Sequence, residues 1–142
     1  MFDTVKNLLK EGEKLVSRFA DKATFQRVIA ACYLIANADG DFDDNEKKAV
    51  ANIIKKELPH FELSDILIEL ASCEEKIRFS STVGNLELLD IISKAKGTDE
   101  AEIIMRICCY IGEADGKFDT DEKLVARDIA TRLGLSSSRY GI

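Results

Sequence analysis

The sequence predicts an all-α fold of about seven helices in a single domain that spans 1–142. Apolar residues recur every three or four positions along almost the whole chain, which is the period of an amphipathic helix. The only proline is Pro59, and no stretch shows the convincing alternation of a half-buried strand. With 142 residues, of which 46% are hydrophobic and 32% charged, the chain can bury one sizeable core.

The first predicted helix covers 2–20 and is amphipathic. Its apolar residues are Phe2, Val5, Leu8, Leu9, Leu15, Val16 and Phe19. A basic edge lies opposite and comprises Lys6, Lys10, Lys14 and Arg18. Such an edge can bind a membrane or a partner, but Glu11 and Glu13 interrupt it. We therefore expect this helix to dock on the core with its charged face in solvent.

The next two helices are predicted over about 25–35 and 43–57. The segment 25–35 is apolar almost all round, so we expect it to be central and buried. In 43–57 the apolar residues fall on one face, and Pro59 ends the helix.

Four further helices complete the predicted fold. Ser64 with Asp65 is typical of a helix start. A helix over about 80–95 is expected to point Val83, Leu86, Leu89 and Ile92 inward. After a break at Gly97, one helix carries the apolar residues from Ile103 to Ile111. The last carries Val125, Ile129 and Leu133 and ends at Gly134.

An internal repeat relates 32–54 to 108–130. Each copy is an apolar helix, a corner reading Ala-Asp-Gly-x-Phe-Asp-x-x-Glu-Lys, and a second helix. The corners end at Lys47 and Lys123, and Cys32 and Cys108 hold equivalent positions. Since neither helical hairpin can bury its apolar face alone, we expect the two to pack about a pseudo-twofold axis.

The paired corners give the chain its resemblance to TerB, the tellurite-resistance B family. The resemblance covers 1–142, because the leading helix 2–20 and the ending Gly141-Ile142 are also similar to the family pattern. It implies an all-helical fold, a cytoplasmic role in tellurite resistance and wider stress responses, and an acidic surface suggested to bind divalent metal. It implies no known reaction.

The acidic corners have two interpretations, which the residues leave open. In the first, Asp43 with Glu46 and Asp119 with Glu122 form capping boxes at helix starts. Capping leaves one acid in each corner unexplained, because Asp39 and Asp115 would lie at the wrong end of a helix dipole.

In the second interpretation the corners ligate a cation. The candidate oxygen ligands are Asp39, Asp41, Asp43, Glu46, Asp115, Asp119, Asp121 and Glu122. Carboxylates of this kind favour calcium, magnesium or manganese over zinc or copper. An EF-hand is excluded, since its first ligand would be Ile35 or Ile111. Lys117 replaces Asp41 in the second corner, which should bind more weakly if the corners act separately.

We expect no catalytic residue and no enzyme activity. His60 is the only histidine, and the chain has neither a nucleophile motif nor a glycine-rich phosphate loop. Tellurite reacts with thiols, but Cys32 and Cys108 lie on apolar helices and are expected to pack in the core. Cys73 is followed by Glu74 and Glu75, which should raise its pKa.

The formal net charge of −6 argues against nucleic acid as a partner. No apolar run approaches the length of a membrane span, so we expect no membrane insertion and a cytoplasmic location. Two functions follow. One is a cation-responsive interaction module in a tellurite-resistance system. The alternative is a metal-independent acidic scaffold that binds a basic partner. The resemblance implies partners within that system, including an integral membrane protein that would place the chain near the membrane's inner face.

Overall fold

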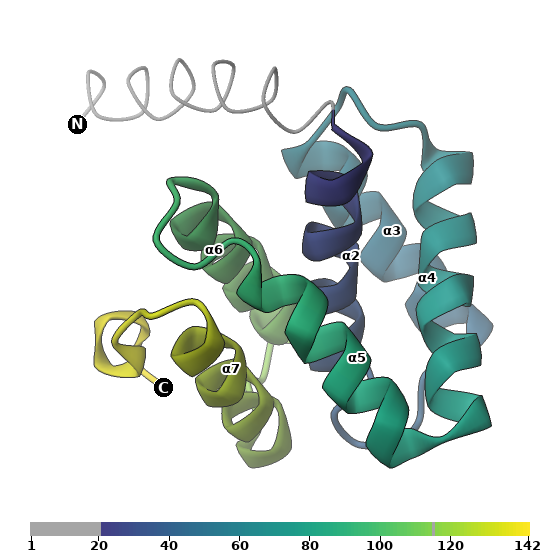
Figure 1. Ribbon diagram of the computed structural model, residues 1–142. Helices are drawn as coiled ribbons and strands as arrows, with labels where there is room; N and C mark the ends of the chain where they lie inside the picture. Colours follow the sequence, from purple (N-terminus) through teal and green to yellow (C-terminus); the bar gives the residue numbers. More distant parts are fainter. Residues whose placement is uncertain (1–20, 115) are drawn as a thin grey trace.

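The computed structural model describes residues 21–114 and 116–142, so the predicted helix over 2–20 lies outside the described part. Within that part all regular structure is helical and no strand occurs, as the sequence predicts. The elements are α2 (Lys22–Ala36), α3 (Asp44–Glu57), α4 (Leu63–Phe79), α5 (Ser81–Ser93), α6 (Glu100–Glu113), α7 (Thr120–Arg132) and the 3-10 helix η1 (Ser137–Tyr140) (Figure 1).

Helix α2 is the centre of the fold. It packs against each of the helices α3 to α7 (Figure 1). Every residue from Val28 to Ile35 is buried, which confirms the expectation from its apolar sequence. A helix that is apolar on all sides is stable in water only where other elements cover all of those sides.

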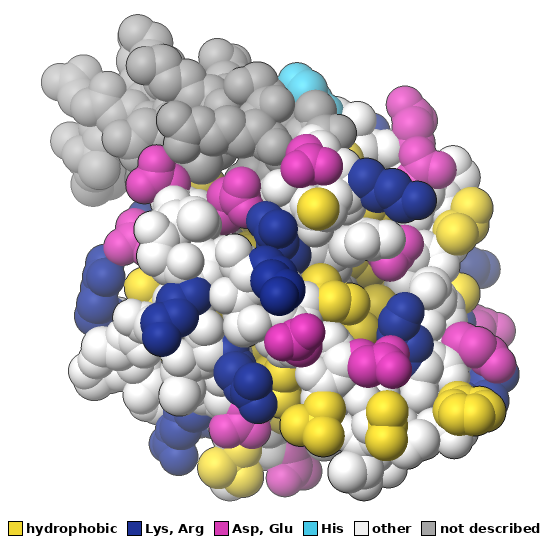
Figure 2. Space-filling model, in the orientation of Figure 1, with side chains coloured by type: hydrophobic (Ala, Val, Ile, Leu, Met, Phe, Trp, Pro, Cys, Tyr) yellow, Lys and Arg dark blue, Asp and Glu magenta, His cyan; other side chains and the backbone are white. Residues whose placement is uncertain are grey.

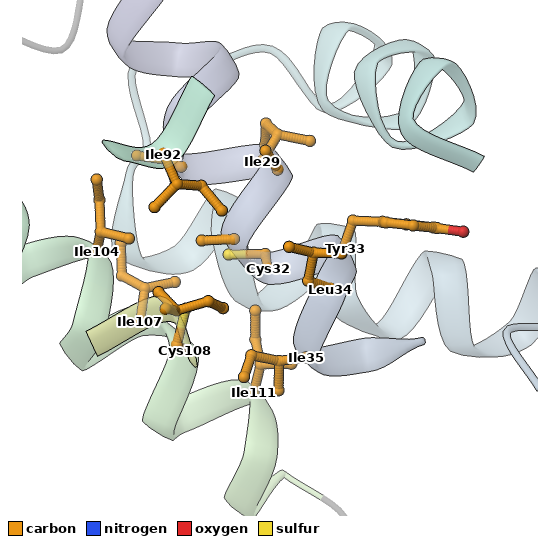
Figure 3. Packing of buried hydrophobic residues seen from close by; sticks show 14 of the residues in the cluster. Ile29, Cys32, Tyr33, Leu34, Ile35, Ile92, Ile104, Ile107, Cys108 and Ile111 are labelled. Atoms are coloured by element: carbon orange, nitrogen blue, oxygen red, sulfur yellow. The ribbon is translucent and has the colours of Figure 1, made fainter. Parts of the chain in front are cut away.

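Helices α2 and α6 pack side by side so that equivalent residues of the two repeat copies contact each other. At their starts, the Thr24 hydroxyl donates to Oε1 of Glu100 at 3.4 Å. In their middles, the side chain of Cys108 hydrogen-bonds to that of Cys32 among buried isoleucines (Figure 3). Both contacts join equivalent positions of the two copies. Since the starts touch and the middles touch, the helices run in the same sense, and their C-terminal ends lie toward the same end of the molecule.

The turn before α4 is held by hydrogen bonds to backbone carbonyls. Lys55 Nζ donates to the carbonyl oxygens of Pro59 at 2.7 Å and Phe61 at 2.8 Å. The Phe61 ring lies 4.5 Å from the Phe25 ring, between centroids, so the start of α4 lies beside the start of α2. Helix α4 begins at Leu63, one residue before the predicted start at Ser64, and the expected side-chain cap does not form.

Helix α5 has its core face rotated from the predicted one. Val83 and Leu86 were expected inward, but they are 52% and 55% exposed. The cause is Gly84, at which a Cβ atom would lie 2.6 Å from the Lys76 carbonyl oxygen. This close approach of the two backbones turns Gly84, Leu88 and Ile92 toward the core, and Val83 and Leu86 face away.

Candidate functional site

The first corner connects α2 to α3 through a tight turn. Gly40 adopts the left-handed conformation, with φ at 81°, as predicted. Oδ1 of Asp39 accepts the Asp41 amide at 2.9 Å, and Oδ1 of Asp43 accepts the Glu46 amide at 2.8 Å. Asp39, which capping leaves unexplained, therefore has a structural role of its own. It forms an Asx turn, which a sequence of Asp followed by Gly favours.

The second corner, between α6 and α7, has nearly the same backbone. Gly116 has φ at 84°, and the cap residue Asp119 has φ at −77° and ψ at 175°, against −81° and 175° for Asp43. The capping box is complete, since Asp119 Oδ1 accepts the Glu122 amide at 2.8 Å and Glu122 Oε1 accepts the Asp119 amide at 3.2 Å. Asp115 lies outside the described residues.

The described candidate ligands lie on the surface. Only Glu122 among them is half-buried, and the exposed ones are Asp39, Asp41, Asp43, Glu46, Asp119 and Asp121. Both corners follow the C-terminal ends of the paired helices α2 and α6, so they lie toward one end of the molecule. Within residues 21–114 and 116–142, no three His, Cys, Asp or Glu side chains come together in a way that could hold a metal ion.

The lysine that ends the first corner, Lys47, forms ion pairs. Lys47 Nζ lies 3.2 Å from Glu74 on α4 and 3.7 Å from Asp44. Glu74 also pairs with Arg78 at 3.2 Å. Lys47 therefore ties α3 to α4, and the carboxylates of the preceding turn keep their negative charge toward solvent.

The described thiols are arranged for packing. Cys32 and Cys108 are fully buried, in agreement with the expected core role. The hydrogen bond that the Cys108 thiol donates to Cys32, together with burial, holds the pKa of Cys108 well above its usual value. Burial, and then Glu69, raises the pKa of Cys73 to about 12. The predicted direction for Cys73 is confirmed, although its predicted cause, the adjacent Glu74 and Glu75, is not. Thiols held in the protonated form are poor nucleophiles at neutral pH.

Comparison with known proteins identifies a family. The family model described as tellurite resistance protein TerB matches residues 25–141, which include both corners and all of the helices from α3 onward. No curated protein and no solved structure matches the chain. Among the described helices, none combines the length and the apolar character that crossing a bilayer requires.

Proposed function

Because the chain belongs to the TerB family, we propose that it is a non-enzymatic interaction module of a tellurite-resistance system whose acidic corners bind positive charge on a partner. The observation that supports this proposal is the position of the two corners at one end of the α2–α6 pair. A surface of one sign attracts a partner of the opposite sign and orients it on approach.

The first corner carries most of this charge. Residues 39–46 hold five acidic and no basic side chains. All five acids, Asp44 included, are exposed, and the next residue, Lys47, is paired with Asp44 and Glu74. In the second corner, 115–122, Lys117 opposes four acids. We therefore assign the greater share of partner binding to the first corner.

Direct binding of a basic partner protein is the favoured form of this function. The Oδ1 atoms of Asp39, Asp43 and Asp119 already accept backbone amides. A lysine or arginine side chain can form an ion pair with one of the remaining carboxylate oxygens. A metal ion needs several ligand oxygens directed at the same point. The partner belongs to the same resistance system. If it is the integral membrane component, the chain lies at the inner face of the membrane.

A divalent cation at the corners is the second candidate. The Asx turn holds Asp39 and Asp41 on either side of Gly40, so two like charges share one rigid turn. A calcium, magnesium or manganese ion would relieve their repulsion. Such a solvent-open site should bind in about the micromolar to millimolar range.

One experiment separates the two candidates. Amide chemical shifts of the full-length protein are followed during titration with a lysine-rich peptide and, separately, with calcium, magnesium and manganese salts. In the first arm, we expect shifts at Asp41 and its neighbours that weaken as sodium chloride is raised. The variant Asp39→Asn/Asp41→Asn should lose them, whereas Asp65→Asn/Asp90→Asn, with the same change of net charge on α4 and α5, should keep them.

The proposal is also testable in cells. A strain that depends on this protein for growth on tellurite should lose resistance with Asp39→Asn/Asp41→Asn and keep it with the control pair. Peptide shifts without cation shifts support direct partner binding. Cation shifts below about a millimolar that the corner variant abolishes would put the cation first. If neither ligand shifts the corners and the corner variant keeps full resistance, the acidic surface has no such role.

A further inference from the structure

The corner where α4 turns into α5 presents an apolar face to solvent. Phe79 is 92% exposed, and Val83 and Leu86 on the next helix are 52% and 55% exposed. We call these three residues the α4–α5 face. Hydrophobic side chains gather along the lower edge of the molecule, where these two helices meet (Figure 2). Large apolar groups grouped in this way mark a contact surface, whereas singly exposed ones are ordinary.

The α4–α5 face lies close to the first corner. Lys47, which ends that corner, places its Nζ atom 3.2 Å from Glu74 on α4 and 3.7 Å from Asp44 in the corner itself. Phe79 follows Glu74 by five residues, which is about 8 Å along the axis of α4. The exposed acids of the first corner and the α4–α5 face therefore lie at the same end of the molecule, and one partner can contact both.

The surroundings of the α4–α5 face are acidic. Residues 74–90 hold four acidic and two basic side chains. Glu87 and Asp90 are exposed on α5, and neither forms an ion pair with another residue in the described part. Arg78, one of the two bases, is paired with Glu74 at 3.2 Å. An apolar centre with a polar rim is the usual anatomy of a protein interface, and an acidic rim complements positive charge on the partner.

The size of the α4–α5 face indicates that it forms only part of an interface. Its three side chains present roughly 300 Å² of apolar surface, whereas a stable interface takes about 800 Å² from each partner. The first corner adds area at the same end of the molecule. A second copy of this chain is disfavoured, because a twofold interface brings identical surfaces together and places the same acidic rim on both sides. The anionic lipid of a bilayer would be repelled by that rim.

We propose that one helix of a partner protein, apolar on one side and edged with lysine or arginine, binds the α4–α5 face and the first corner together. This inference rests on the function proposed above for the corners, and it adds an apolar contact to that function. Phe79 and Leu86 pack against apolar residues spaced three and four apart on the partner helix, while Asp39 and Asp41 pair with its basic edge. A helix of four turns is about 22 Å long, which is enough to reach both surfaces.

Two synthetic peptides test the proposal. Both carry the same number of lysines at helical spacing, but one has leucines along the other side of the helix and the second has glutamines there. Fluorescence anisotropy should show that the wild-type protein binds the leucine–lysine peptide about tenfold more tightly than the glutamine–lysine peptide. Phe79→Ser/Leu86→Ser should remove that difference, because it removes the apolar contact. Asp39→Asn/Asp41→Asn should weaken the binding of both peptides, because each pairs its lysines with the corner.

The matched control removes exposed apolar side chains elsewhere on α4. Leu63 and Ile68 are 38% and 66% exposed, and both lie toward the start of the helix. Leu63→Ser/Ile68→Ser should keep the tenfold difference. Circular dichroism confirms that each variant is folded. The methyl signals of Val83 should move when the leucine–lysine peptide is added, and they should stay in place with the glutamine–lysine peptide.

The two parts of this interface can fail separately. Equal affinity of the wild type for the two peptides, or a difference that survives Phe79→Ser/Leu86→Ser, would overturn the role of the α4–α5 face and leave the function proposed for the corners intact. An affinity for the leucine–lysine peptide that depends on Phe79 but is unchanged in Asp39→Asn/Asp41→Asn would instead refute the role of the first corner. A wild-type dimer in light scattering that becomes monomeric in Phe79→Ser/Leu86→Ser would show that a second copy occupies the face.

Discussion

The two corners of the repeat have almost the same backbone but different side chains. Gly40 and Gly116 differ by only 3° in φ, at 81° and 84°. Yet the first corner presents Asp41 where the second presents Lys117. The comparison shows that the same turn forms with either charge at the position after the glycine. That position can therefore set the charge of each corner without changing its backbone.

The corners also bury their phenylalanines differently. The Phe42 ring packs edge-on against Tyr33, with centroids 5.4 Å apart. The Phe118 ring lies over Gly112, so close that a Cβ atom there would be 2.6 Å from it. The position equivalent to Gly112 in the first copy is Ala36. The equivalent phenylalanines are therefore packed differently. Phe42 lies against an aromatic ring, and Phe118 fills the space left by the absent side chain of Gly112.

The largest expected effect is a loss of stability at alkaline pH, caused by the residues at the equivalent positions 33 and 109. Burial raises the pKa of Tyr33 from 10.0 to about 12 and that of Cys109 from 9.0 to about 11. Both groups are thus favoured in their neutral forms by the fold. Their contribution to the free energy of unfolding is complete at a pH below the pKa values of the unfolded chain. It is lost as the pH rises through the pKa values of the folded protein. The denaturant concentration at the midpoint of unfolding should decrease as the pH is raised from about 9 to about 12. Tyr33→Phe with Cys109→Ala should flatten that fall, and an unchanged slope would contradict it.

The next largest effect concerns the paired cysteines. Cys32→Ala and Cys108→Ala should each lower the free energy of unfolding by about 1–3 kcal/mol, because each leaves a small cavity in a fully buried site. Chemical denaturation measures the loss. We expect both folded variants to support growth on tellurite. A folded double variant without resistance would instead assign the thiols a direct role.

A smaller effect should distinguish the packing of the two corners. Gly112→Ala should cost about 1–2 kcal/mol, because the added methyl displaces the Phe118 ring. Phe118→Leu in the same chain should recover part of that loss by removing the crowded ring. Thermal unfolding of wild type and the two variants provides the measurement. A Gly112→Ala variant more stable than wild type would show that the ring moves aside freely.

The smallest effect compares the caps. Asp43→Ala and Asp119→Ala should each cost about 1 kcal/mol, since each removes the acceptor for a helix N-terminal amide. Asn at either position should restore most of the loss, because its carbonyl oxygen accepts the same bond. Urea unfolding of the four variants decides between these outcomes, and a loss below about 0.3 kcal/mol would mean that the cap is not a stabilising one.

The sequence alone determined those features that depend on a few neighbouring residues. The left-handed glycines, the caps at Asp43 and Asp119, and the last helix's end before Gly134 are local, since the hydrogen-bond partners lie within a few positions. The burial of α2 was equally predictable, because a helix that is apolar on every side has no face suited to water.

Only the tertiary structure decided which faces and which acids come together. The outward turn of Val83 and Leu86 depends on the backbone of α4 at Lys76, which no pattern within α5 reveals. Likewise, the corners lie toward one end because Thr24 reaches Glu100 and Cys32 reaches Cys108. Periodicity predicts that a helix has an apolar side, but the direction of that side depends on how closely neighbouring backbones approach.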